Sequence, residues 1–172
     1  MTTFAPQKDI FTAGSGKPKY YERRGKFGLM ELKTGDRFRT AWDLEKSYND
    51  SYHRAGVGID FCQQEQRGAY SCLITGRGQY DQDTDDGSGD TVRFQQSKFG
   101  LANRAMQHNI ESKQPVRLFS PEWVEEPDSF GPSRFMTFRG MFRVTRFDPS
   151  TGIYLLKRVT VGSKTTRPEL AR

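Results

Sequence analysis

The stretch that most constrains the fold is a strand–turn–strand pattern near the C-terminal end of the sequence. Alternating apolar residues occupy 140–147 (GMFRVTRF) and 153–161 (IYLLKRVTV), and DPSTG (148–152) separates them. Asp and Pro favour the start of a turn, and Gly152 supplies a residue that tolerates positive φ where a five-residue loop closes. The pattern therefore predicts an antiparallel β-hairpin.

Shorter strand-like runs precede this hairpin, with turn signals between them. They cover 36–44 (DRFRTAWDL), 68–76 (GAYSCLITG) and 115–119 (PVRLF). Only residues 100–111 (GLANRAMQHNIE) have the apolar spacing of a helix, and 120–133 is expected to be a long, proline-bounded loop. The combination predicts an α+β domain built on a curved sheet or partly closed barrel with one or two helices.

The length of 172 residues suits one domain. Composition predicts a mobile basic N-terminal arm over 1–24, a folded domain over 25–162 and a C-terminal tail over 163–172. No apolar run approaches the ~20 residues of a membrane span, and no secretory signal is apparent, so we expect an intracellular protein without a membrane partner. Cys62 and Cys72 lie in apolar stretches without metal-ligand spacing, which predicts reduced, buried thiols and no metal site.

The charge of the chain is unevenly distributed. The formal net charge is +6 and the sequence pI is about 9.4, which favours a polyanionic partner, although many intracellular proteins are basic without binding nucleic acid. Residues 76–94 (GRGQYDQDTDDGSGDTVRF) nevertheless hold five aspartates, and the chain without those five acids would carry +11 (6 + 5). The acidic segment therefore calls for a specific chemistry or is an ordinary surface loop.

Calcium binding is the first possible chemistry for this segment. Asp81, Asp83 and Asp85 alternate as they do in an EF-hand loop. That loop requires glycine at its sixth position and glutamate at its twelfth, where this chain has Asp86 and Val92. Calcium is therefore not expected.

A metal-dependent nuclease and a base-binding pocket are the other two chemistries. A nuclease of the Asp…Glu-x-Lys type would use Asp90 with Glu111 and Lys113, but this Glu-x-Lys triplet follows a helix where a strand is expected. A pocket for an everted cytosine needs two flat walls and an acceptor for the N4 amino group. Tyr80 and Phe94, with aspartates and glycines between them, supply these parts.

Four motifs occur in a fixed order along the chain: GAYSCLITGRGQYDQDTDDG (68–87), NRAM (103–106), KQPVRLF (113–119) and YLLKR (154–158). They resemble the strand with its acidic segment, the Asn-Arg-Ala-Leu helix, the Lys-Pro-Val-Arg strand and the closing strand of the SRA (SET- and RING-associated, or YDG) domain. Members of that family bind methylated DNA and flip the modified cytosine into a pocket. The resemblance implies a PUA-like, twisted, partly closed β-barrel with flanking helices and a concave basic DNA-binding face.

The resemblance also implies roles for individual residues. Tyr80 matches the tyrosine that stacks on one face of the flipped base, Phe94 falls where an aromatic covers the other face, and Asp83 matches the acid that accepts from the cytosine amino group. The remaining implied pocket residues are Thr75, Gly76, Arg77, Gly78, Gln95 and Ser97. The implied loops that enter the DNA or contact its backbone contain His53, Arg54, Gly56, Val57 and Lys98.

Two departures from the family pattern affect the expected specificity. The Tyr-Asp-Gly signature appears as Phe138-Arg139-Gly140, and the segment 96–101 is too short for the long basic finger of well-studied relatives. We therefore expect a monomeric, cofactor-free, non-enzymatic reader of 5-methylcytosine or 5-hydroxymethylcytosine in relaxed sequence contexts. In a eukaryote it would be nuclear, and otherwise cytoplasmic. A modification-dependent endonuclease within the same fold and a related RNA-binding barrel remain the alternatives.

Overall fold

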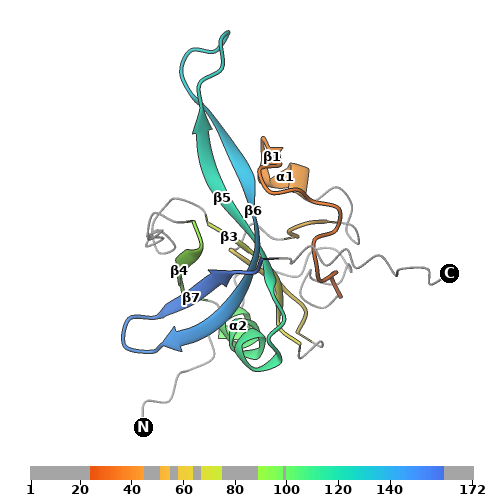
Figure 1. The fold of residues 1–172 in the computed structure, drawn as a ribbon, viewed down its shortest axis with the longest axis vertical. Helices are drawn as coiled ribbons and strands as arrows, with labels where there is room; N and C mark the ends of the chain where they lie inside the picture. The colour runs from red at the N-terminus through yellow and green to blue at the C-terminus, as the bar shows by residue number, and fades with distance from the viewer. Residues whose placement is uncertain are drawn as a thin grey trace, which may run out of the picture.

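The computed structural model describes residues 24–44, 51–54, 58–63, 67–74, 89–98 and 100–160, which form one mixed sheet with two helices (Figure 1). The strands are β1 (Arg37–Phe38), β2 (Ile59–Phe61), β3 (Ala69–Leu73), β4 (Thr91–Gln95), β5 (Val116–Val124), β6 (Ser133–Asp148) and β7 (Ile153–Arg158). The helices are α1 (Ala41–Leu44) and α2 (Gly100–Ser112).

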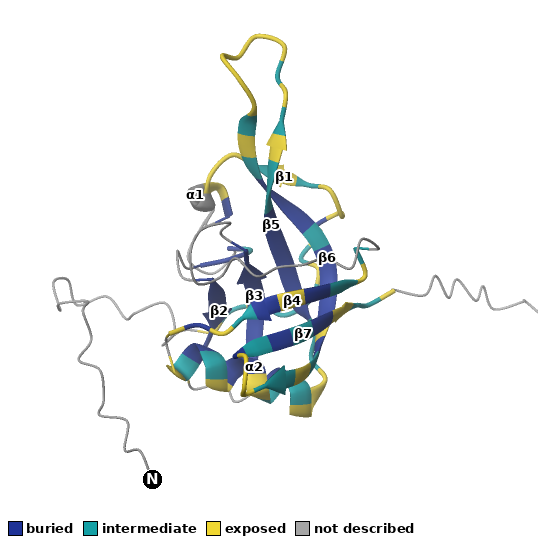
Figure 2. Ribbon diagram, turned by 90° about the vertical axis from the view of Figure 1, so that its left-hand side faces the viewer, coloured by how far each residue is buried: buried dark blue, intermediate teal, exposed yellow. Residues whose placement is uncertain are grey.

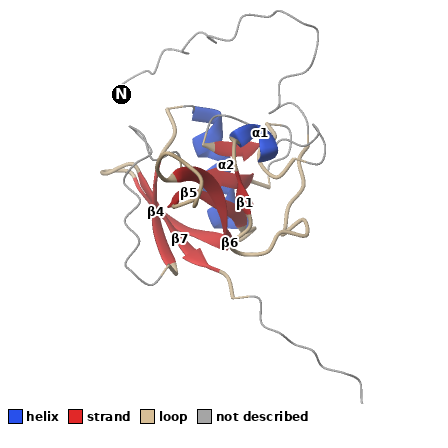
Figure 3. Cartoon of the chain, turned by 90° about the horizontal axis from the view of Figure 1, so that it is seen from above, coloured by secondary structure: helices blue, strands red, loops and turns tan. Residues whose placement is uncertain are grey.

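The strand order is β2-β3-β5-β6-β7-β4, and β1 pairs with β6 outside this path. The β3–β5 pair is parallel and the other pairs are antiparallel. Within the described ranges no ladder joins β2 to β4, which lie at the two ends of the order. Side chains of both strands nevertheless belong to one core cluster, so the sheet curves around that cluster (Figures 2 and 3).

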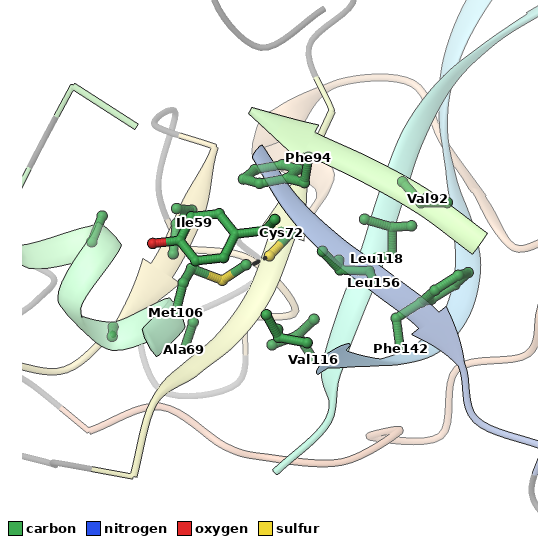
Figure 4. Packing of buried hydrophobic residues seen from close by; sticks show 14 of the residues in the cluster. Ile59, Ala69, Cys72, Val92, Phe94, Met106, Val116, Leu118, Phe142 and Leu156 are labelled. Atoms are coloured by element: carbon green, nitrogen blue, oxygen red, sulfur yellow. Dashed lines mark hydrogen bonds between the residues drawn. The ribbon is translucent and has the colours of Figure 1, made fainter. Parts of the chain in front are cut away.

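The main core lies between this curved sheet and α2. Ala102, Ala105 and Met106 of the helix pack against residues of β2, β3, β4, β5, β6 and β7, and the Cys72 Sγ atom lies 3.5 Å from the Met106 Sδ atom (Figure 4). Cys62 and Cys72 are both buried and form no disulfide, as the sequence predicted. A smaller core packs Leu32, Leu44 and Leu73 against apolar side chains of β5 and β6, namely Phe119, Met136, Phe138 and Met141.

The two strongest sequence predictions are confirmed. Strands β6 and β7 form the expected hairpin, and the backbone N–H of Gly152 donates to the carbonyl of Asp148 with φ of +71° at Gly152. The helix predicted over 100–111 is α2. None of the helices in the described ranges has the length and apolar character needed to cross a membrane.

The strand predicted over 36–44 is mostly wrong. Only Arg37 and Phe38 pair with β6, and the chain then turns into α1. A capping box explains the helix start: the Thr40 hydroxyl accepts from the Asp43 N–H at 3.3 Å, and the Asp43 carboxylate accepts from the Thr40 N–H at 2.9 Å.

The loop predicted over 120–133 is also too long. Strand β5 continues through Pro121 to Val124, and β6 begins at Ser133, because the two strands pair along this whole length. Strands β2, of three residues, and β4, of five, were not predicted. The predicted arm and tail lie outside the described residues except for Arg24.

Candidate nucleic-acid interface

Residues 74–90, which contain most of the acidic segment, connect β3 to β4, and the structure describes the two ends of this connection. At the first end, the backbone N–H of Ile74 donates to the Phe119 carbonyl of β5 at 2.8 Å. At the second end, Gly89 and Asp90 lead into β4 beside β7. The predicted pocket residues between these ends lie outside the described residues: Thr75, Gly76, Arg77, Gly78, Tyr80 and Asp83, together with the Asp81 and Asp85 of the calcium alternative.

Arg158, the last residue of β7, fixes the second end of the segment. Its Nε atom donates to the Asp90 Oδ1 atom at 3.0 Å, and its Nη2 atom donates to the Gly89 carbonyl at 2.6 Å. Its Nη1 atom donates to the Arg139 carbonyl on β6. The guanidinium also lies 4.8 Å from the centre of the Phe142 ring. One side chain thus ties the end of the acidic segment to the middle of the sheet.

Gly140 makes room for this arginine. Leu118 pairs with Gly140 and Phe119 pairs with Phe138, so Arg139 is an extra residue that forms a β-bulge. Gly140 has φ of +114°, and a Cβ atom there would lie 2.8 Å from the Nη1 atom of Arg158. A larger residue at this position would be strained and would displace the arginine.

The predicted pocket residues on and after β4 are held by other parts of the fold. Phe94 is fully buried in the main core, so the described structure gives its ring a packing role, and its stacking role stays a prediction. The Gln95 amide donates to the Gly152 carbonyl at 3.1 Å. Ser97 is buried, and its backbone N–H donates to the Asn103 side chain of α2 at 2.9 Å. Of the predicted backbone-contacting residues, Lys98 is exposed.

No protein-family model matches the sequence, and neither does any curated protein. Solved structures do match. KRYPTONITE in complex with mCHG DNA and SAH superposes with a TM-score of 0.58 and 23% identity, over 81% of this chain and 34% of that chain. The SUVH5 SRA–hemimethylated CG DNA complex superposes with a TM-score of 0.53 and 19% identity, over 86% of this chain and 98% of that chain. SUVH9 superposes with a TM-score of 0.55 and 18% identity, over 82% of this chain and 31% of that chain.

This chain has the SRA fold. It spans about a third of the KRYPTONITE and SUVH9 chains and nearly all of the SUVH5 SRA chain. Gly140, which the resemblance matched to the last residue of the family signature, is the bulge glycine beneath Arg158. Arg139, at the position expected for the signature aspartate, donates from its Nη1 atom to the Ser120 hydroxyl at 3.1 Å.

The loop expected to enter the DNA starts from buried residues. His53 shares a 2.7 Å hydrogen bond with the Ser71 hydroxyl. Arg54 forms an ion pair with Asp60 at 3.0 Å, and both side chains are almost fully buried. A buried side chain cannot reach a phosphate without leaving its partners, so the structure gives His53 and Arg54 the role of holding the loop. Gly56 and Val57, which follow them, lie outside the described residues.

A hollow of about 260 Å³ is lined by residues of β5 and β6, among them Ser120, Glu122, Thr137 and Arg139, and sequence reasoning did not find it. Arg37 of β1 makes two 3.0 Å hydrogen bonds to the Glu122 carboxylate, and the Thr137 hydroxyl donates to it at 2.7 Å. These bonds, chiefly those from Arg37, lower the pKa of Glu122, so this carboxylate stays ionised. Arg37, Glu122 and Arg139 together carry a formal charge of +1. The only sequence feature that could have pointed to this hollow is Arg139, a basic residue at the position expected for the signature aspartate.

The geometry disfavours the nuclease alternative. Asp90, its first proposed metal ligand, is engaged by Arg158, and Glu111 lies on α2 rather than on a strand. Across the described ranges, no group of three or more His, Cys, Asp or Glu side chains could hold a metal ion.

Replacing Arg158 with methionine is expected to lower the free energy of unfolding by about 1–3 kcal/mol, because the Gly89 and Arg139 carbonyls lose a charged donor. The amides next to Asp90 should also exchange hydrogen faster. Urea denaturation and hydrogen exchange measure these effects. Arg143→Met, an exposed change on β6, is the control and should cost within about 0.5 kcal/mol. Equal losses in the two variants would contradict the role of Arg158.

Proposed function

We propose that this chain binds duplex DNA containing a modified cytosine and holds that base outside the helix. The observation that carries the proposal is the SRA fold, shared with nearly the whole SUVH5 SRA chain of a hemimethylated CG DNA complex. The basic net charge of +6 supports it, because lysines and arginines attract the phosphate backbone.

In this proposal Tyr80 stacks on one face of the everted base, and Asp83 accepts a hydrogen bond from its exocyclic amino group. Phe94 covers the other face. Because the Phe94 ring is fully buried without DNA, its stacking role requires the ring to be uncovered when the base enters. Arg158 supports the reading residues from a distance by fixing the end of the acidic segment at Asp90.

The energies of the individual steps agree with a moderate preference for the modified base. Eversion costs a few kcal/mol, and stacking on an aromatic ring contributes about 1–3 kcal/mol per base. Burial of one methyl group contributes about 0.8 kcal/mol, which corresponds to a several-fold preference. Phosphate contacts by residues such as Lys98 would supply the remaining affinity.

The finer features of the proposal follow the resemblance. We expect a concave basic face on a partly closed barrel, recognition of 5-methylcytosine or 5-hydroxymethylcytosine in relaxed sequence contexts, and binding by a monomer without catalysis. Nuclear location is proposed for a eukaryotic host.

The proposal is tested by comparing two duplexes that differ by a single methyl group on one cytosine, at a stated salt concentration of ~100 mM. The methylated duplex should bind several-fold more tightly, as measured by gel shift or fluorescence anisotropy. Equal affinities would reject methyl reading.

Two further experiments test the alternative functions. RNA of the same length should compete poorly with the methylated duplex. Methylated plasmid should remain intact when it is incubated with the protein and Mg²⁺, whereas cleavage would favour the endonuclease.

A further inference from the structure

Strands β5 and β6 extend beyond the body of the molecule as a hairpin, and we call its outer part, residues 121–136, the hairpin tip (Figures 1 and 2). Two large apolar side chains of the tip remain uncovered. Trp123 is 64% exposed, and Phe130 is fully exposed. Among the described residues, Leu29 is the only other exposed large hydrophobic side chain, at 39%. Aromatic residues are enriched in protein–protein interfaces, so two uncovered rings on one projecting element point to a binding surface.

The stem of the tip is braced against the β1 segment. Arg37 holds Glu122 with two hydrogen bonds, and Arg39 pairs with Glu126 at 3.0 Å. The Arg39 guanidinium also lies 5.4 Å from the centre of the Phe135 ring. This bracing presents the tip in a defined orientation, so binding would cost less conformational entropy than it would for a free loop.

The charge of the tip selects the class of partner. Residues 125–132 contain Glu125, Glu126 and Asp128 and no lysine or arginine. This segment therefore carries −3, and the rest of the chain carries +9 (6 + 3). Such a segment repels phosphates, so it does not suit DNA, and it attracts basic groups.

We propose that the hairpin tip is a docking site for a protein segment that carries lysine or arginine beside an apolar side chain. The rings of Trp123 and Phe130 would cover the apolar group and face the cation, and the carboxylates of Glu125 and Asp128 would pair with the positive charge. This role uses a surface separate from the acidic segment and does not depend on DNA binding.

The experiment selects peptides from a random 12-residue phage-display library on the immobilised full chain. A Trp123→Ala/Phe130→Ala double variant serves for counter-selection. Peptides that bind only the native chain should be enriched in lysine or arginine next to an apolar residue. The affinity of a selected peptide, followed by calorimetry, should fall at least ten-fold in Glu125→Lys/Asp128→Lys. It should be unchanged in Glu111→Lys, an exposed charge reversal on α2.

Three results would overturn the proposal. The first is the recovery of no peptide that depends on Trp123 and Phe130. The second is an affinity that the Glu125→Lys/Asp128→Lys reversal leaves unchanged. The third is concentration-dependent self-association that the double alanine variant abolishes, since this would make a second copy of the chain the occupant. All of these side chains are exposed, so unchanged melting temperatures will show that the variants are folded.

Discussion

Replacing Asp60 with alanine is expected to lower the free energy of unfolding by about 3–5 kcal/mol, a large part of the stability of a typical domain. Asp60 accepts hydrogen bonds from the backbone N–H of Arg54, at 3.1 Å, and from its guanidinium, at 3.0 Å. Without the carboxylate, the buried guanidinium of Arg54 would lose this counter-charge. Equilibrium urea denaturation measures the loss.

A second buried cation makes this loss larger. Arg117 on β5 is fully buried and donates to the carbonyls of Lys26, Gly28 and Tyr52. Burial lowers the pKa of Arg117 to about 10, and the nearby Asp60 opposes this shift. The arginine is therefore still charged at neutral pH, and it depends partly on Asp60.

Asp90→Ala is the matched control for Asp60→Ala. It also removes an aspartate from an ion pair with an arginine, but the Asp90 side chain is 67% exposed, whereas the Asp60 side chain is 1% exposed. An exposed pair contributes at most about 1 kcal/mol. If both variants lost the same stability, the Arg54–Asp60 pair would not have the role that its burial indicates.

Asp83→Ala is expected to weaken binding of a methylated duplex several-fold, to about the affinity of the unmodified duplex, since a hydrogen bond to a base edge contributes about 1–3 kcal/mol of discrimination. Affinity for the unmodified duplex should change far less. Fluorescence anisotropy with both duplexes at the same salt concentration measures the two values.

Asp86→Ala separates a specific contact from a general effect of charge. It removes the same charge from the same acidic segment, and we expect it to leave the preference for the methylated duplex nearly unchanged. Equal losses in the two variants would show that Asp83 does not read the base. Thermal melting of both variants will confirm that they are folded.

The sequence predicted those elements whose signals are local. The β6–β7 hairpin was found because alternation and turn residues lie within about twenty consecutive positions, and α2 was found from its spacing. Helix α1 was not predicted, because 36–44 has the strand-like pattern, although the capping box of Thr40 and Asp43 marks a helix start. The extension of β5 through Pro121 was missed because proline usually interrupts a strand.

The contacts around the candidate site could not be predicted, because they join distant parts of the chain. Arg158 meets Gly89 across 69 positions and Asp90 across 68. The bulge that makes Gly140 necessary depends on its pairing with β5. The family resemblance marked this glycine but not its partner. His53, in contrast, is buried, and its burial indicates that it holds a loop. Its position in a segment predicted to contact DNA did not suggest this role.

The most direct test of base eversion is a crystal structure of this chain bound to a duplex with one 5-methylcytosine. We predict that the methylated base lies outside the helix and stacks on Tyr80, with an uncovered Phe94 ring on its other face. The Asp83 carboxylate should lie within hydrogen-bond distance of the N4 atom. A complex in which the methylated base remains stacked inside the duplex, with the Phe94 ring still packed in the main core, would contradict the account.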